Sequence, residues 1–156
     1  MLTVHHLATS QSDRIVWLCE ELGITYDLKR YDRDPVTRLA PADYRALHPI
    51  GTAPVISDGD VVLGESAAIV EYIIHRYGQG RLLVPSDDAT YPDYLFWFHF
   101  ANGSFMPAAM MGLVAGMATS GGSPAASALT QRLDRAWDMV EARLGQSPYL
   151  AGADFT

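Results

Sequence analysis

Short apolar runs alternate with amphipathic runs over the first third of the chain. Residues 2–7 form a short, partly β-branched run that two histidines interrupt, and a polar stretch of Thr, Ser, Gln and Asp follows it, as in a strand that leads into a helix. Residues 13–22 place apolar side chains at helical spacing, and Gly23 is a residue type that ends helices. A second strand is predicted at residues 26–31. The proline-rich connection after it has room for a short helix at residues 42–47.

An Asp-Gly step marks the next pair of strands. Residues 54–56 and 61–63 are rich in strand formers and flank residues 57–60, which is a strong signal for an antiparallel hairpin. A helix is predicted at residues 65–77, with Ser66 as a good capping type at its start. The order βαβ followed by ββα is typical of the thioredoxin-like fold, an α/β domain with a four-stranded mixed sheet.

The composition changes after this helix. Residues 79–88 are polar and rich in turn formers, which indicates a linker. Residues 92–116 and 124–144 then show helical patterns, Pro92 suits the first turn of a helix, and the Gly121–Gly122 pair predicts the turn between the two helices. We therefore expect an α/β domain at 1–78, a linker at 79–88 and an all-helical domain at 89–156.

Charge and cysteine content exclude several classes of protein. The 156 residues carry a formal net charge of −7 without a basic run, so no nucleic-acid partner is expected. No apolar run approaches the roughly 18 residues of a membrane span, so no membrane association is expected either. Cys19 is the one cysteine, which favours a reducing, cytoplasmic setting. Because His5 and His6 lack partners at ligand spacing, we expect no metal.

Residues 51–73, GTAPVISDGDVVLGESAAIVEYI, resemble the glutathione-site signature of the glutathione transferases. They combine a proline before a strand, an Asp-Gly hairpin, a Glu-Ser pair and an apolar helix in the order that the family uses. Residues 10–27 and 147–156 also resemble the family. The resemblance implies a thioredoxin-like glutathione-binding domain followed by an all-α domain, in a cytoplasmic homodimer that serves in detoxification.

The resemblance assigns the backbone beside Pro54 to the cysteinyl part of glutathione. The corresponding proline of the family follows a cis peptide bond, and before proline the cis form costs only about 0.5 to 1 kcal/mol. The Ala53 N–H and C=O groups would then pair with the extended ligand as a strand does. From the dipeptide alone an edge-strand or turn proline is the better interpretation, and the surrounding signature reverses that preference.

Glu65 and Ser66 are expected to bind the two charges at the γ-glutamyl end of glutathione. Ser66 stands at a helix start, where N–H groups and the helix dipole favour an anion such as the γ-glutamyl carboxylate. Glu65 would offer its carboxylate to the γ-glutamyl ammonium group. The alternative is that Ser66 is an N-cap and Glu65 an acid favoured by the dipole, and both interpretations can hold together.

The loop before the first helix is expected to hold the glutathione sulfur as a thiolate. A thiol with an ordinary pKa of about 8.5 is mostly protonated at neutral pH, so the protein must lower that pKa. Residues 10–14 resemble the serine-type loops of the family, which makes Ser10 the catalytic hydroxyl. Thr9, Ser10 and Ser12 are all acceptable helix caps. We assign catalysis to Ser10 and the cap to Ser12, with Thr9 and Ser12 as the catalytic alternatives.

Several further residues have roles that the pattern leaves open. His48 is either a glutathione contact or a loop residue. Thr52 stands where relatives carry a basic residue for the glycine carboxylate of glutathione, so Arg14, Arg38 and His48 are unranked candidates for that task. Cys19 falls on the apolar face of its helix and is expected in the core.

The function that the resemblance implies is the transfer of glutathione, as a thiolate, to a small apolar electrophile. Aromatic and methionine side chains after residue 92 are of core-forming types, and some of them are expected to line the electrophile pocket. They are Tyr94, Phe96, Trp97, Phe98, Phe100, Met106, Met110 and Met111. Two alternatives use the same fold: a noncatalytic protein that binds glutathione or a protein partner, and a glutathione-dependent peroxidase.

The chain is expected to continue beyond Thr156. In the family, the segment that residues 149–156 resemble leads directly into a buried helix with Ser or Thr as its N-cap. Without that helix, the apolar faces of the two long helices would stay partly uncovered. We therefore expect the helical domain to be incomplete at residue 156.

Overall fold

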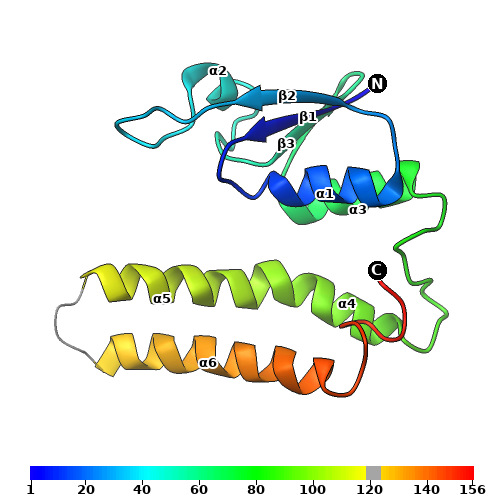
Figure 1. Ribbon diagram of the computed structural model, residues 1–156, viewed down its shortest axis with the longest axis vertical. Coiled ribbons are helices and arrows are strands. Elements are labelled where there is room, and N and C mark those ends of the chain that lie inside the picture. The colour runs from blue at the N-terminus through cyan, green and yellow to red at the C-terminus, as the bar shows by residue number, and fades with distance from the viewer. Residues whose placement is uncertain (119–123) are drawn as a thin grey trace. The chain divides into compact units, whose positions relative to one another are not determined.

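The computed structural model describes residues 1–118 and 124–156, and its first unit, Met1–Arg81, is built on a four-stranded sheet (Figure 1). The strands are β1 (Leu2–Leu7), β2 (Asp27–Tyr31), β3 (Val55–Asp58) and β4 (Val61–Gly64), in the order β2-β1-β3-β4. β1 is parallel to β2 and antiparallel to β3, and β3 is antiparallel to β4. This mixed sheet confirms the predicted thioredoxin-like topology.

Helices cover both faces of the sheet (Figure 1). α1 (Asp13–Leu22) and α3 (Ser66–Tyr77) pack side by side on one face, and α2 (Ala42–Arg45) lies on the other. α1 is also the crossover connection that the parallel strands β1 and β2 require. The buried apolar side chains of α1 and α3 are Ile15, Cys19, Leu22, Ile69, Ile73 and Ile74.

A smaller core on the α2 side fixes the end of β1. Leu7, Tyr31, Tyr44 and Val55 are buried there together. The rings of Tyr31 and Tyr44 meet edge to face with centroids 5.0 Å apart, and the Tyr44 hydroxyl donates to the His5 carbonyl at 3.2 Å. Burial raises the pKa of Tyr44 to about 12, so this hydroxyl keeps its hydrogen at neutral pH.

The structure shifts several predicted boundaries of strands and helices. β2 begins one residue later, at Asp27, and α2 ends two residues earlier, at Arg45. β3 begins after Pro54, because proline has no N–H to donate to a ladder. It extends to Asp58, which leaves Gly59 and Asp60 as a two-residue turn in which Gly59 has a φ of 59°.

The second unit, Leu82–Thr156, consists of helices and an irregular C-terminal segment in its described residues. α4 (Tyr91–Phe100) has Pro92 in its first turn, as predicted. It continues through the π-helical turn η1 (Ala101–Phe105) into α5 (Met106–Ala118). The last helix, α6 (Pro124–Leu144), packs beside α5 (Figure 1). The apolar pattern does not predict η1. The predicted turn at Gly121–Gly122 lies outside the described residues. No helix among residues 1–118 and 124–156 is long and apolar enough to cross a membrane.

Asp58, at the end of β3, connects the hairpin to α3 and to the N-terminus. Its Oδ2 accepts hydrogen bonds from the Tyr77 hydroxyl at 2.5 Å and from the Tyr72 hydroxyl at 2.9 Å. Arg76 Nε lies 3.4 Å from Oδ2, and the N-terminal ammonium group lies 3.7 Å from Oδ1. The hydrogen bond from Tyr77 is the main cause that lowers the pKa of the Asp58 carboxyl.

We expect Asp58→Asn to lower the free energy of unfolding at neutral pH by about 1 to 2 kcal/mol, because it weakens hydrogen bonds to a charged acceptor. A carboxyl whose folded-state pKa is lowered stabilises the fold above its unfolded value of about 3.9, and this stability is lost as the pH falls through the lower folded value. The difference between wild type and variant should therefore be full near pH 7 and shrink below about pH 4. Urea unfolding at several pH values measures it. Asp60→Asn, which changes an exposed carboxylate in the adjacent turn, is the control, and an equal loss in both variants would contradict the prediction.

Candidate functional site

Three chain segments meet at one end of the sheet. Val55, the first residue of β3, pairs with His5 of β1 and with Gly64 of β4. The loop after β1, the peptide bond before Pro54 and the start of α3 therefore lie at the same sheet end. These segments carry the predicted residues Ser10, Ala53, Pro54, Glu65 and Ser66.

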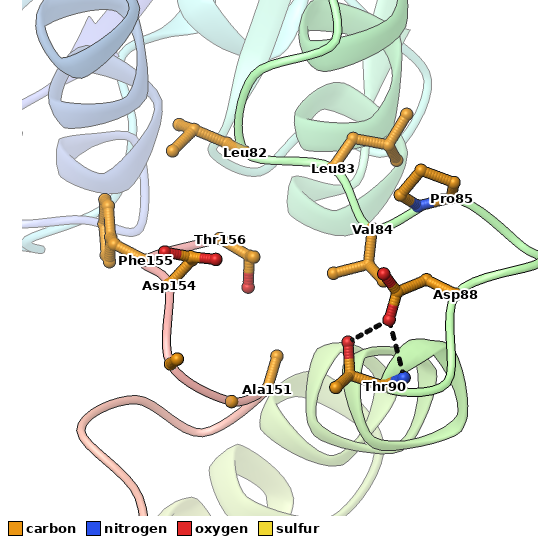
Figure 2. A pocket seen from close by; sticks show the side chains of 12 residues that line it. Leu82, Leu83, Val84, Pro85, Asp88, Thr90, Ala151, Asp154, Phe155 and Thr156 are labelled. Atoms are coloured by element: carbon orange, nitrogen blue, oxygen red, sulfur yellow. Dashed lines mark hydrogen bonds between the residues drawn. The ribbon is translucent and has the colours of Figure 1, made fainter.

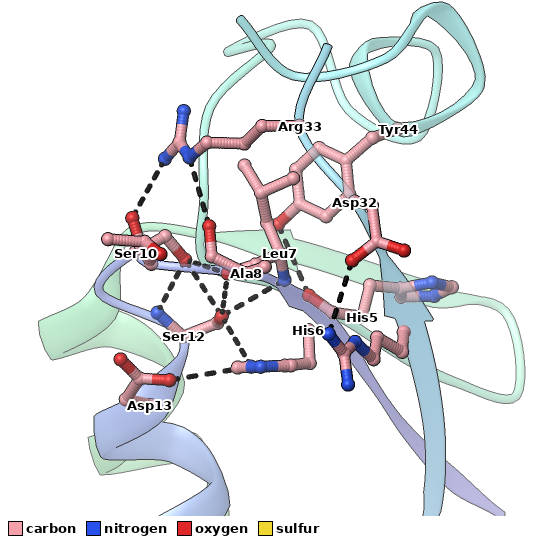
Figure 3. Close-up of polar contacts among 12 residues, drawn as sticks. His5, His6, Leu7, Ala8, Ser10, Ser12, Asp13, Asp32, Arg33 and Tyr44 are labelled. Carbon is pink, nitrogen blue, oxygen red and sulfur yellow. Dashed lines mark hydrogen bonds and ion pairs between the residues drawn. The ribbon is translucent and has the colours of Figure 1, made fainter. Parts of the chain in front are cut away.

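Arg33 holds the loop between β1 and α1. Its Nε donates to the Ala8 carbonyl at 2.9 Å and its Nη2 to the Thr9 carbonyl at 3.1 Å (Figure 3). Its Nη1 donates to the Arg38 carbonyl at 2.9 Å. Thr9 has a φ of 54°, a left-handed conformation that residues other than glycine rarely adopt. The sequence does not predict this role of Arg33, because no local pattern connects an arginine after β2 with the loop after β1.

Ser12 is fully buried and belongs to the framework of this loop. Its Oγ accepts a hydrogen bond from the Leu7 N–H at 3.1 Å and lies 3.0 Å from His6 Nδ1 (Figure 3). It occupies the N-cap position of α1, but with φ −68° and ψ −17° it is already helical, and its side chain caps no N–H of the helix. The prediction that the Ser12 side chain caps α1 is therefore wrong, and its burial argues against a contact with a ligand sulfur.

Ser10 lies partly exposed beside Ser12. Its Oγ donates to the Leu7 carbonyl at 2.7 Å, accepts from the Ser12 N–H at 3.2 Å and lies 2.8 Å from Ser12 Oγ. It borders a hollow of about 430 Å³ that is lined by Ser10, Gln11, Asp13, Arg14 and Trp17. A small molecule in this hollow would meet the Ser10 side of the loop.

The peptide bond between Ala53 and Pro54 is cis, as the resemblance implies. Pro54 is buried, and Ala53 is partly buried and packs against the core of Leu7, Tyr31, Tyr44 and Val55. Because the ladder between β1 and β3 ends at the pair of His5 and Val55, the Ala53 backbone lies outside that ladder. An extended ligand can pair with such a backbone as an added strand does.

Arg14 and Ser66 bring the starts of α1 and α3 together. Arg14 Nη1 donates to Ser66 Oγ at 3.4 Å, and Ser66 is only 4% exposed. Ser66 is the first residue of α3 and Glu65 holds the N-cap position, so the alternative interpretation of Ser66 as the N-cap is wrong. From the sequence, Arg14 is one of three candidates for the glycine carboxylate of glutathione, and the structure joins it to Ser66.

The charges at the start of α3 have both signs. Burial lowers the pKa of the Arg14 guanidinium, which still carries its positive charge at neutral pH. Glu65 is exposed and has φ 68° and ψ 117°, a conformation that a non-glycine residue adopts only at a cost of about 1 to 3 kcal/mol. With the positive dipole end of α3, these groups suit a ligand that carries a carboxylate and an ammonium group side by side.

His48 packs against the strand end that leads to Glu65. Its Nδ1 accepts a hydrogen bond from the Ile50 N–H at 3.2 Å. A Cβ atom at Gly64 would lie 3.2 Å from His48 Nδ1, so glycine permits this close approach. Arg38 and Thr52 are exposed, and the Arg38 carbonyl accepts the bond from Arg33.

Cys19 is a buried core residue, as predicted. It lies on the inner face of α1 with Ile15 and Leu22. Burial, together with the nearby Glu20 charge, raises the pKa of its thiol to about 12. A thiol of this kind stays protonated at neutral pH and is a poor nucleophile.

The aromatic side chains of the second unit contact one another, but those of α4 are not buried in a core. Ring pairs run from Tyr94 to Phe98, from Phe96 to Phe100 and from Phe105 to Trp137, and no side chain of α4 is buried. The unit also has a hollow of about 330 Å³ between residues 82–90 and 151–156 (Figure 2). Asp88 at its edge accepts hydrogen bonds from Thr90 N–H and Oγ1, both at 2.7 Å, and thus serves the start of α4.

Comparisons with known proteins agree on one family. The family described as "Glutathione S-transferase, N-terminal domain" matches residues 9–76. A curated "Glutathione S-transferase 3" of Schizosaccharomyces pombe is 42% identical over 107 residues, which are 69% of this chain and 43% of that protein. The chain spans about half the length of the curated relatives that it matches first.

Solved structures extend the likeness over the whole chain. The crystal structure of a glutathione S-transferase from Actinobacillus pleuropneumoniae is 35% identical, has a TM-score of 0.90 and is matched over 100% of this chain and 72% of its own. A theta class glutathione S-transferase from Xanthomonas axonopodis pv. citri, with glutathione bound, is 25% identical with a TM-score of 0.74, over 99% of this chain and 74% of its own.

We expect Arg33→Met to loosen the loop at residues 8–12 without unfolding the first unit. Loss of hydrogen bonds from a charged donor, about 1.5 to 3 kcal/mol, should speed amide hydrogen exchange in this segment roughly tenfold or more. Exchange measured by mass spectrometry on peptides that cover residues 7–14 tests this. Arg30→Met is the matched control, because Arg30 pairs with Asp32 on the exposed surface of β2. Equal exchange in the two variants would show that Arg33 does not hold the loop.

Proposed function

Because the chain belongs to the glutathione transferase family, we propose that the protein binds glutathione, holds its sulfur as a thiolate and transfers it to an apolar electrophile. The observation that carries this proposal is the convergence of the Ser10 loop, the cis Ala53–Pro54 bond and the Arg14–Ser66 pair at one end of the sheet. Each of these features matches one chemical part of glutathione.

The peptide parts of glutathione would be bound by α3 and the backbone before β3. The γ-glutamyl carboxylate would lie at Ser66 and Arg14, and the γ-glutamyl ammonium group at Glu65. The Ala53 N–H and C=O groups would pair with the cysteinyl backbone beside Pro54. Since Arg14 serves the γ-glutamyl end in this arrangement, Arg38 and His48 are left as candidates for the glycine carboxylate.

The sulfur would be held by the Ser10 hydroxyl. Ser10 Oγ now donates its hydrogen to the Leu7 carbonyl, and a thiolate is a stronger, charged acceptor for that hydrogen. The positive dipole end of α1 favours the same anion. In the reaction the thiol proton leaves to solvent and a thiolate electron pair forms the carbon–sulfur bond. A leaving group departs with its electron pair or, in an addition, the adduct takes up a proton.

Three finer points belong to the same proposal. The apolar character of the electrophile rests on exposed side chains of α4 and α5, among them Phe96 and Met110, which are 48% and 51% exposed. Detoxification and a homodimer follow from the family resemblance. A cytoplasmic setting is supported by the free thiol of Cys19 in a chain with one cysteine.

Replacing Ser66 by Ala should weaken glutathione binding. The loss of one hydrogen bond to a charged ligand, about 1.4 kcal/mol, corresponds to a roughly tenfold higher Kd, which calorimetric titration measures. Ser86→Ala changes an exposed serine of the second unit and should leave the Kd unchanged. An unchanged Kd in Ser66→Ala would argue against this anion site.

Replacing Ser10 by Ala should lower kcat more than it weakens glutathione binding. Removal of a donor that acts on a developing anion costs roughly a hundredfold in kcat, and the pKa of the bound thiol should rise. A conjugation assay with a panel of electrophiles, and a pH titration of thiolate absorbance, measure both effects. If wild type binds glutathione but conjugates no electrophile, the noncatalytic alternative is favoured. Turnover with peroxides alone would favour the peroxidase.

A further inference from the structure

The hydroxyls of Ser10 and Ser12 form a chain that ends at His6, a residue to which the proposed function gives no role (Figure 3). Ser10 Oγ lies 2.8 Å from Ser12 Oγ, and Ser12 Oγ lies 3.0 Å from His6 Nδ1. Ser12 is fully buried, so solvent does not compete for its hydroxyl. The direction of the hydrogens along this chain decides whether Ser10 can donate to a ligand.

The number of lone pairs limits the possible directions. A serine hydroxyl has one hydrogen and two lone pairs. The Leu7 N–H at 3.1 Å occupies one lone pair of Ser12 Oγ. If His6 Nδ1 carries a hydrogen, it occupies the second, and the Ser12 hydrogen is left for Ser10 Oγ or for the Leu7 carbonyl at 3.2 Å.

Ser10 is then free to donate outward. Its Oγ accepts from the Ser12 hydroxyl and from the Ser12 N–H, so both its lone pairs are filled and its own hydrogen can turn from the Leu7 carbonyl to a ligand. If His6 Nδ1 carries no hydrogen, the Ser12 hydrogen points to His6. Ser12 Oγ then has one lone pair open, which draws the Ser10 hydrogen inward.

Asp13 favours the first arrangement. Its Oδ1 lies 3.7 Å from His6 Nδ1, and a carboxylate is an acceptor only. The negative charge beside Nδ1 therefore favours the tautomer that carries its hydrogen on this nitrogen. Arg30 is the register partner of His6 on β2, and its own charge is paired with Asp32, whose Oδ1 lies 3.3 Å from Arg30 Nη2.

We propose that His6 is a positioning residue: its Nδ1–H, oriented by Asp13, turns the Ser12 hydroxyl toward Ser10 so that the Ser10 hydrogen is available to the glutathione sulfur. This inference rests on the proposed function, since it needs a thiolate beside Ser10. His6 touches neither the ligand nor the reacting atoms, and it acts through Ser12.

Two substitutions of His6 separate its hydrogen bond from its bulk. His6→Phe keeps a ring without a donor, and the pKa of enzyme-bound glutathione should rise by roughly one unit, which corresponds to about 1.4 kcal/mol. His6→Asn places an amide N–H near the position of Nδ1 and should restore a pKa close to that of wild type. His75→Phe removes an exposed histidine of α3 and should change nothing. Equal pKa values in His6→Phe and His6→Asn would overturn the inference.

Asp13→Asn separates the proposed role of His6 from a direct charge effect, because the two predict opposite changes in the pKa of bound glutathione. Asp13 is 70% exposed, so this variant should fold even if His6→Phe does not. Asp13 borders the same hollow as Ser10, so by charge alone its neutralisation should lower the pKa of a bound thiol. The inference predicts a rise instead, because His6 loses the negative charge that favours a hydrogen on its Nδ1. A lower or unchanged pKa overturns the inference. If the wild-type protein binds glutathione and lowers the pKa of its thiol in the same experiment, the proposed function holds whatever the variants show. If the wild-type protein does neither, the proposed function and the role of His6 both fail.

Discussion

The pairing of Val55 with both His5 and Gly64 is the constraint on which the candidate site depends. It brings the loop after β1, the cis bond before β3 and the start of α3 to one end of the sheet. Because side chains alternate along a strand, a slip of one residue in β3 would turn Val55 away from its core and move Ala53 out of place. The core of Leu7, Tyr31, Tyr44 and Val55 holds this register. Packing on the α2 face and the geometry of the site are therefore coupled.

The end of the β1–β3 ladder explains why the loop after β1 carries two hydroxyls. The ladder stops at His5, so the backbone of buried Leu7 needs other partners on that side. Ser12 Oγ accepts from the Leu7 N–H, and Ser10 Oγ donates to the Leu7 carbonyl. The hydrogen that Ser10 would offer to a ligand is thus engaged by the Leu7 carbonyl in this structure.

The sequence predicted what local pattern and a contiguous motif can carry. Strand β1 and helix α1 follow from the spacing of apolar residues, and the cis bond before Pro54 follows from the family signature. It could not predict contacts that only the fold creates. Ser10 and Ser12 are both acceptable helix caps by residue type, and the fold separates them, because Ser12 is fully buried and Ser10 borders the hollow. Arg33 and Arg14 act on segments far away in the sequence, and a charged residue in a loop or on a helix gives no sign of its partner.

Asp13 shows how two opposed effects share one residue. As an acid in the first turn of α1 it stabilises the helix by about 0.3 to 1 kcal/mol, yet its charge borders the hollow where a thiolate would form. Its side chain is 70% exposed, and salt screens exposed charges beyond about 8 Å at physiological ionic strength. The electrostatic effect of the Asp13 carboxylate is therefore strongest on its near neighbour His6, whose Nδ1 lies 3.7 Å from Asp13 Oδ1. The Asp13 charge raises the pKa of a thiol bound in the hollow, but under the proposed role of His6 it also favours the Nδ1–H that donates to Ser12. The second effect lowers the pKa of the bound thiol through Ser10 and so opposes the first.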